Sequence, residues 1–433
     1  MTPPLTGNMS LPLRIQRDIA VNVTINQFIW PALDMSTAFF GSNYTKQRFS
    51  QIDQPLWMGY KRIILDLYWN SSHWQLCPTL NCSFTFTDYV LALNRYLLST
   101  EVTTDPTQTN LITLILNLHN NNNNSAVTTD LSSIILKSVS PFRIYTPSNL
   151  TLDRVNATLL VHASDLKWPP LLYIIKQKVQ LLIGFGDTSL SQDSVTVSSH
   201  DKALIFGQHA LSNTVEHYNC QQDPTSWSFV RDAQVPFTFN TSSDLVRCGY
   251  SPVFTHSTSS SDILSTIWSW EIDQPDSEDG AKRCASINQS TGRWITSDCA
   301  DTLRVACRLA TDVDQWVLTD TAYNYDRSLT ACPSNYIFDI PRQPRQNLYL
   351  LQAMQNANLS HGEKGQVEYL GLIKTSVVAG VIILLLVSIF TWVKCARLWR
   401  NRNSKARKAM VKAMLSRREY VTVPVKLIFR YRI

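Results

Sequence analysis

The stretch KRIILDLYW, residues 61–69, decides the fold of this 433-residue chain. It is a short apolar run closed by polar residues, which is typical of a strand buried on both faces. Three further runs have the same character: LITLILNLH (111–119), ATLLVHA (157–163) and VQLLIGFG (179–186). We therefore predict at least four buried strands in the first half of the chain.

A helix is predicted between the first two of these strands. The segment FTDYVLALNRYLLS, residues 86–99, carries Leu, Tyr and Val at helical spacing, and Thr87 or Asp88 can cap its N-terminus. Buried strands that alternate with helices indicate an α/β fold with a parallel sheet. That sheet is either a barrel or a doubly wound layer.

The character of the sequence changes near Ile263, where short segments rich in Trp and Cys begin. The change predicts an α/β domain over residues 14–255 and a second, small domain over residues 263–355. The polar residues that follow, 356–374, are predicted to form a stalk.

A membrane span is predicted after the stalk. Residues 375–393, TSVVAGVIILLLVSIFTWV, contain no charged side chain. As a helix they span roughly 28 Å, close to the ~30 Å hydrocarbon core of a bilayer. Residues 394–433 then carry 13 Lys and Arg and one acid, Glu419. Such a basic tail stays in the cytosol, so the chain is predicted to be a single-pass type I membrane protein.

The tail itself predicts few partners. Its basic residues can bind anionic lipid, and no nucleic-acid-binding module accompanies them, so direct contact with nucleic acid is not expected. The part before the span is then lumenal or extracellular, where it is expected to meet an unknown protein or glycan partner.

Glycosylation motifs and cysteines support that orientation. Eight of the nine cysteines precede the span, an even number suited to disulfides in an oxidising compartment. Eleven N-x-S/T motifs also precede it, and none follows. Their asparagines are Asn8, Asn22, Asn43, Asn70, Asn81, Asn123, Asn149, Asn156, Asn240, Asn288 and Asn358. Residues 1–13 lack the apolar run of a signal peptide, so we expect a truncated N-terminus.

Candidate catalytic residues lie where the predicted strands end, because a barrel places its reactive groups there. Asp66, His119, His162 and Asp165 qualify, and a histidine beside a carboxylate can carry out general acid–base chemistry. The alternative is a structural role for each of them. No nucleotide-binding or metalloprotease motif is present, so no cofactor is predicted.

The second domain resembles the C-terminal half of C-type-lectin-like domains. Cys284, Trp294, Cys299 and Cys307 have the spacing of that family, and Gln274-Pro275-Asp276 stands at its calcium-binding triplet. Other ligand positions hold Lys282, Arg283 and Ile295, and a hard cation needs six or more oxygen ligands. The resemblance therefore implies a calcium-free module with no metal. Its expected binding surface comprises Trp268, Trp270, Gln274, Asp276 and Trp294.

The missing half of that domain is expected downstream, in residues 316–353, as in a circular permutation. This arrangement implies Cys284–Cys299 and Cys307–Cys332 disulfides, and we expect Cys77–Cys82 and Cys220–Cys248 beside them. Eight cysteines allow 105 pairings, so other connectivities stay open.

Over nearly its whole length the chain resembles a fungal membrane family, maintenance of telomere capping protein 6. The resemblance rests on QRDIAVNVTINQ, RIILDLYWN, LITLILNLH, YTPSNLTLDR, IWSWEIDQP and ACPSNYIFDIPR. It implies a lumenal TIM-barrel-like domain and a genetically defined, indirect role in telomere capping.

The barrel more remotely resembles phosphatidylinositol-type phospholipases C. That family has His-Asn after an early strand and Glu-x-Asp on a later one, where this chain has Leu33-Asp34 and Ile64-x-Asp66. Without that histidine the mechanism lacks its general base. We therefore predict a non-catalytic barrel that acts as a binding protein. The alternative is a hydrolase of phosphodiesters or glycans that uses Asp66 with His119 or His162.

Overall fold

The computed structural model describes most of the chain before the predicted membrane span. The described residues are 7–41, 43–70, 72–79, 82–101, 110–120, 127–158, 168–186, 195–232, 234–276, 282–361 and 367–369. The predicted span (375–393) and basic tail (394–433) lie outside them. Within the described ranges, no helix is both long and apolar enough to cross a membrane.

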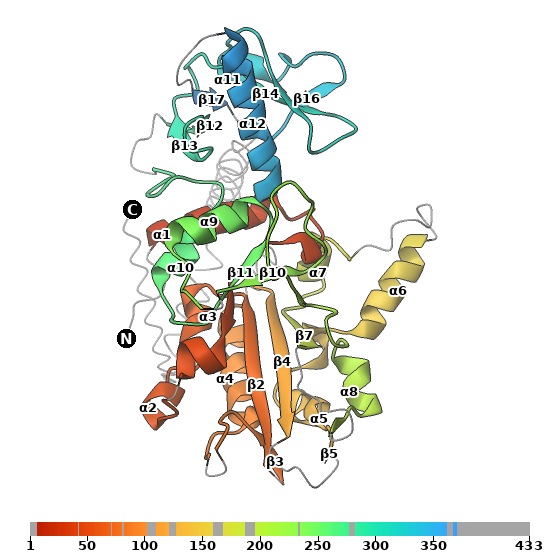
Figure 1. Ribbon diagram of the computed structural model, residues 1–433. Coiled ribbons are helices and arrows are strands. Elements are labelled where there is room, and N and C mark those ends of the chain that lie inside the picture. The colour runs from red at the N-terminus through yellow and green to blue at the C-terminus, as the bar shows by residue number, and fades with distance from the viewer. Residues whose placement is uncertain are drawn as a thin grey trace, which may run out of the picture. The chain divides into compact units, whose positions relative to one another are not determined.

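One large sheet forms the framework of the first domain (Figure 1). Its strands pair in parallel along one continuous order, and β3 (His73–Gln75) adds an antiparallel hairpin to the end of β2. The order is β6 (Ile144–Tyr145), β7 (Leu181–Phe185), β4 (Ile112–Asn120), β2 (Arg62–Asn70), β1 (Ala32–Asp34), β11 (Ser251–Phe254), β10 (Ser228–Arg231) and β9 (Asn213–Thr214).

A short segment links β7, near one end of this strand order, to β9 at the other end. Phe206 forms a parallel bridge with Gly184 of β7, and the chain then runs to β9, which pairs with β10. A barrel forms when the two ends of one sheet are joined in this way. In a regular TIM barrel consecutive strands are neighbours, whereas here β4 pairs directly with β7, and the two-residue β6 lies beyond it. The fold is therefore a partial TIM barrel.

Helices separate most of these strands. They are α1 (Gly7–Ile19), α2 (Lys46–Phe49), α3 (Gln54–Met58), α4 (Phe86–Ser99), α5 (Leu131–Leu136), α6 (Pro147–Thr158), α7 (Leu171–Lys176), α8 (Ser199–Leu204), α9 (Phe239–Arg247) and α10 (Ser260–Ser265). A separate parallel pair consists of β5 (Val127–Thr128) and β8 (Val195–Thr196). Single turns of 3₁₀ or π helix occupy Ile25–Gln27, Met35–Phe40 and Pro141–Arg143.

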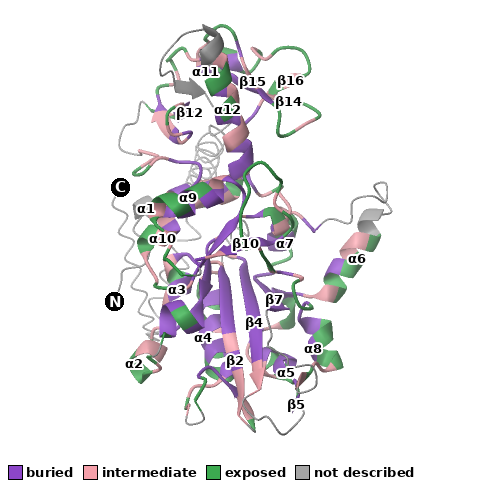
Figure 2. Cartoon of the chain, in the orientation of Figure 1, coloured by how far each residue is buried: buried purple, intermediate pink, exposed green. Residues whose placement is uncertain are grey.

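The alternation of side chains along the strands determines which face packs against the helices. Ile63, Leu65 and Leu67 of β2 share one apolar cluster with Tyr89 and Leu93 of α4. The residues between them point to the other face, because side chains alternate along a strand. Both β2 and β4 are buried over most of their length and become half-buried towards their C-terminal ends (Figure 2).

The predicted strands at 61–69, 111–119 and 179–186 are confirmed as β2, β4 and β7, and the predicted helix 86–99 as α4. The cap of α4 differs from the prediction. The Thr85 side chain accepts from the Asp88 amide, and the Asp88 carboxylate accepts from the Thr85 amide at 2.9 Å. This reciprocal pair forms a capping box, so Thr87 is not the cap.

The prediction of a strand over residues 157–163 is wrong for the two of these residues that the structure describes. Residues 157 and 158 end helix α6, and 159–163 lie outside the described part of the chain. Short apolar runs do not by themselves distinguish a strand from a buried helical turn.

The C-terminal region contains two antiparallel three-stranded sheets. One has the order β13 (Trp294–Ser297), β12 (Cys284–Asn288), β17 (Val367–Tyr369), and the other β15 (Trp316–Leu318), β14 (Ala306–Leu309), β16 (Tyr336–Phe338). Two helices accompany them, α11 (Tyr325–Ser328) and α12 (Pro344–His361). The last helix therefore enters the predicted stalk. A lectin identity for this region stays a prediction.

Four disulfides are present, and they are the four pairs expected from the sequence. Cys284–Cys299 and Cys307–Cys332 lie in the C-terminal region, and Cys77–Cys82 and Cys220–Cys248 in the barrel. The two regions are also joined by side chains. Arg293 of the C-terminal region donates to the Ser243 hydroxyl of α9 in the barrel at 2.7 Å.

A buried cation lies where β2 begins. Arg62 is 0% exposed, and burial lowers its pKa to about 9. Its guanidinium donates to the Ser251 hydroxyl at 2.6 Å and to the Phe28 carbonyl at 2.8 Å. The rings of Trp30, Trp227 and Phe229 lie 4.8–5.8 Å from it. Cation–π contacts of this kind strengthen when they are desolvated.

Replacing Arg62 by Ala is expected to lower the free energy of unfolding by about 3–5 kcal/mol, because it leaves a cavity and two unpaired acceptors. Arg62→Met restores most of the volume and should lose roughly half as much. Urea unfolding of the full chain, followed by tryptophan fluorescence, measures both. An equal loss of unfolding free energy in the two variants would contradict the prediction, because stability would then depend on the charge of Arg62 and not on its volume.

Candidate functional site

The inner face of the barrel carries the polar residues. Along β2 the residues that alternate onto this face are Arg62, Ile64, Asp66 and Tyr68. The parallel register aligns Asp66 with Asn117 of β4 and Tyr68 with His119. Polar groups therefore meet at the carboxyl ends of the strands, where a barrel places its active site.

Asp66 is the centre of one cluster. Asn117 donates its Nδ2 to Asp66 Oδ1 at 2.8 Å, and His119 Nε2 lies 3.4 Å from the same oxygen. The Asp66 amide donates to the Ser36 hydroxyl at 3.4 Å. Burial acts to raise the pKa of Asp66, but hydrogen bonds from His119, Asn117 and Ser36 outweigh it and hold the pKa below its ordinary value. Asp66 is therefore a carboxylate at neutral pH.

A second carboxyl, Asp34, ends strand β1. Its Oδ2 accepts from Arg231 Nη1 at 2.8 Å, and its Oδ1 accepts from the Thr37 amide at 3.1 Å, which caps the π-helical turn. Burial raises the pKa of Asp34 despite Arg231, and the nearby charge of Asp66 raises it further. The two aspartates thus have pKa values displaced in opposite directions, a pattern that separates acid from base roles.

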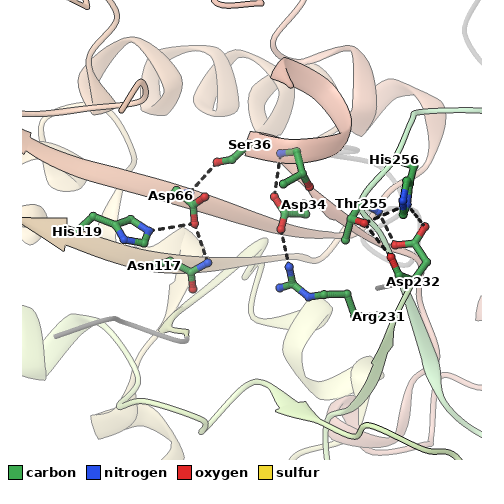
Figure 3. Close-up of polar contacts among 10 residues, drawn as sticks. Asp34, Ser36, Asp66, Asn117, His119, Arg231, Asp232, Thr255 and His256 are labelled. Atoms are coloured by element: carbon green, nitrogen blue, oxygen red, sulfur yellow. Dashed lines mark hydrogen bonds and ion pairs between the residues drawn. The ribbon is translucent and has the colours of Figure 1, made fainter. Parts of the chain in front are cut away.

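A third carboxyl, Asp232, follows strand β10. Its Oδ2 lies 3.2 Å from His256 Nδ1, and its Oδ1 accepts from the Thr255 amide at 2.7 Å. Figure 3 shows the three groups in a row: Asp66 with His119, then Asp34 with Arg231, then Asp232 with His256. They come from five strands or strand ends of the same sheet.

Two tyrosines border the first of these groups. The Tyr68 ring stacks on His119 with centroids 4.7 Å apart. Burial, together with the charges of Asp66 and Asp34, raises the pKa of Tyr44 to about 12. Both phenols therefore stay protonated at neutral pH and can donate a hydrogen bond.

The structure brings together Asp66 and His119, two of the candidates identified from the sequence. His162 and Asp165 lie outside the described residues. The resemblance to phospholipases C implies a histidine at position 33, and the non-catalytic barrel inferred from its absence stays a prediction. Leu33 does stand where the resemblance expects histidine, but His119 of another strand lies beside Asp66.

Sequence reasoning missed Asn117, Arg231, Asp232 and His256. A signal existed for Asn117, which precedes His119 by two residues on one strand and must share its face. The Asp232–His256 pair had a weaker signal. Asp232 directly follows β10 and His256 lies two residues after the end of β11, and neither of these short strands was predicted.

The three tryptophans expected on the binding surface of the C-terminal region are buried. Trp268, Trp270 and Trp294 are 4%, 2% and 0% exposed and pack edge to face. They form a core and offer no surface to a partner. Gln274 and Asp276 are half-buried, and the Gln274 side-chain oxygen accepts from the Thr296 amide at 2.9 Å and from its hydroxyl.

No group of three or more His, Cys, Asp or Glu is arranged to hold a metal within the described ranges. The sequon asparagines with described side chains are exposed or half-buried, so each has a solvent-facing part. The exposed ones are Asn22, Asn43, Asn149 and Asn240, and the half-buried ones Asn70 and Asn288. The side chains of Asn8, Asn81, Asn123, Asn156 and Asn358 lie outside the described part.

Gly186, directly after β7, gives a test of the cluster. A Cβ at this position would lie 2.3 Å from Asn117 Oδ1 and 2.6 Å from Ile115 Cγ2. Gly186→Ala must therefore displace Asn117, which holds Asp66, and we expect it to lower the free energy of unfolding by about 1–3 kcal/mol. Gly207→Ala is the matched control, since a Cβ there meets nothing within 4 Å. Equal unfolding midpoints for the two variants would contradict this account.

Comparisons with known proteins agree with the fold. A sequence model described as the MTC6 partial TIM-barrel domain matches residues 3–270. A protein named maintenance of telomere capping protein 6 from Komagataella phaffii is 25% identical over 421 residues, which cover 80% of this chain and 79% of the relative. Its namesake from Zygosaccharomyces rouxii is 23% identical over 398 residues, covering 82% and 75%.

A protein of the same name from Saccharomyces cerevisiae is 23% identical over 410 residues, covering 83% of this chain and 76% of the relative. The family match extends from before β1 to beyond α10 and so includes every strand of the large sheet. The chain therefore belongs to the maintenance of telomere capping protein 6 family, through its partial TIM-barrel domain.

Proposed function

We propose that this protein contributes to telomere capping indirectly, as a membrane-anchored glycoprotein whose barrel is a hydrolase of phosphodiesters. The names of its relatives support the first part. The uncharged stretch 375–393, the basic tail and the eleven sequons support the membrane anchor and the lumenal position of the barrel. A lumenal domain cannot touch chromatin, so its effect on telomeres is indirect.

The observation that carries the hydrolase proposal is the contact between Asp66 and His119. A histidine held against a carboxylate can accept a proton from water and return it, which contributes 10²–10⁴-fold to typical hydrolytic reactions. Asp66 is 17% and His119 27% exposed at their side chains, so the pair is accessible and still partly desolvated.

The Asp34–Arg231 group suits a phosphodiester better than a neutral substrate. Arg231 carries a guanidinium, the side chain that best matches the oxygens of a phosphate. In the proposed step His119 takes a proton from the attacking water, the new phosphorus–oxygen bond forms and the ester bond breaks. The leaving oxygen then takes the proton back from the His119 imidazolium, which restores the starting state of the pair.

Hydrolysis of bis(p-nitrophenyl) phosphate by the purified full chain tests this proposal. His119→Gln and Asp66→Asn are expected to lower kcat by about 10²–10⁴-fold, whereas His200→Gln on α8, an exposed histidine, should leave it unchanged. Comparing KM with kcat separates loss of substrate binding from loss of proton transfer.

The p-nitrophenyl glycosides are the comparison substrates. Turnover of a glycoside and not of the phosphodiester would replace the proposed substrate class. If neither is hydrolysed at a rate that depends on His119, the barrel is a non-catalytic binding protein for a protein or glycan partner.

The predicted topology has its own test. Endoglycosidase treatment of the full chain, tagged at its C-terminus, is expected to reduce its apparent mass by many kilodaltons, because the sequons precede the span. An unchanged mobility would place the cysteines in a reducing compartment and overturn the lumenal assignment.

A further inference from the structure

A cavity of about 370 Å³ lies at the opposite end of the barrel from the aspartate–histidine groups. Trp30 and Pro31, which precede β1, line it, together with Lys61 before β2 and Leu111 before β4. Its volume falls within the range of small-molecule sites, roughly 300–1,000 Å³. Neither the proposed reaction nor the family match assigns a role to this end.

The wall of the cavity is mainly apolar. Four buried side chains contribute to it: Phe28, Leu56, Leu111 and Leu171. Trp57 is 40% exposed, and its ring packs edge to face on Tyr96. An apolar wall with one accessible indole suits a hydrocarbon chain, because most of the contact area available to a ligand comes from carbon atoms.

The charged groups in the same wall have one sign. Arg14, Arg17, Lys61 and Arg342 line the cavity, and no Asp or Glu is among its lining residues. Arg17 and Arg342 are paired with Asp18 and Asp339. Lys61 instead donates to the Tyr96 hydroxyl at 3.2 Å and to Asn110 Oδ1 at 2.9 Å, and has no carboxylate partner in the described part of the chain.

The helix over the cavity is held in place independently of any ligand. Gln16 of α1 is 8% exposed, accepts from the Trp268 amide at 3.1 Å and donates to the Thr266 carbonyl at 3.3 Å. Both partners belong to the cavity wall. The site is therefore preformed, which lowers the cost of ordering it on binding.

We infer that this cavity binds a single-chain anionic amphiphile, with the chain against the apolar wall and the carboxylate or phosphate head near Lys61 and Arg14. Among the described residues the Lys61 ammonium contacts two neutral groups and no carboxylate, which favours an anionic head over a neutral one, since opposite charges attract more strongly near low-dielectric walls. The carboxylate and phosphate forms share this chemistry.

Photolabelling of the full chain tests the inference. The probe is a diazirine-bearing, alkyne-tagged palmitate, and labelled peptides are mapped by mass spectrometry. We expect labels on peptides that contain Leu13 to Pro31 or Leu56 to Lys61. Palmitate or hexadecyl phosphate should compete about tenfold better than hexadecanol, a difference of roughly 1.4 kcal/mol. The better of the two anions identifies the head group.

Two variants test whether the positive charges of Lys61 and Arg14 are needed for binding. Lys61→Gln should reduce labelling of these peptides several-fold. Arg14→Gln, whose side chain is exposed and makes no contact with a carboxylate in the described ranges, should reduce it without disturbing the fold. Lys202→Gln on α8 is the matched control and should label as the parent chain does. Phosphodiester hydrolysis should be unchanged in all three, so this test and that of the proposed function fail independently.

Labels confined to other peptides, equal competition by hexadecanol, or unchanged labelling in both Lys61→Gln and Arg14→Gln would overturn the inference.

Discussion

Arg62 is a cation buried without a carboxylate partner in the described chain, and the inner face of the barrel is organised around its position. Its hydrogen bond to Ser251 joins β2 to β11, and its hydrogen bond to Phe28 joins β2 to the segment before β1. The rings of Trp227, just before β10, and Phe229, on β10, lie over the guanidinium. Because side chains on one face recur every second residue, fixing Arg62 also fixes Ile64, Asp66 and Tyr68. Asp66 then lies about 13 Å further along the strand.

The two ends of the barrel consequently differ in chemistry. Cations gather where the strands begin, at Lys61 and Arg62, and carboxylates where they end, at Asp34, Asp66 and Asp232. At the carboxylate end these charges contact histidine, asparagine and arginine side chains, the groups that the proposed hydrolysis uses. The cationic end is mostly apolar and contains the cavity. One fold thus offers a polar, charged end and a separate, mostly apolar end.

The C-terminal region contributes mainly packing and covalent cross-links. Its three tryptophans form an internal edge-to-face cluster, the Trp294 indole donates to Asn347 of α12 at 2.9 Å, and two disulfides close its loops. Arg293 and Gln16 tie it to the barrel through a hydroxyl and a backbone carbonyl. The lectin-like spacing of its cysteines is thus compatible with a structural role.

The sequence alone predicted the strands β2, β4 and β7, the helix α4 and the family, because these depend on local periodicity and on motifs along the chain. It named the four disulfide pairs only as one of 105 possible sets, and the structure has that set. It also identified Asp66 and His119 as separate candidates. Only the tertiary structure decided that they meet, that Asp232 pairs with His256, and that the tryptophans expected at a surface are buried. Those facts depend on the register between strands and on how the sheet closes, which bring together residues as far apart in the sequence as Ala32 and Val253 and leave no local pattern.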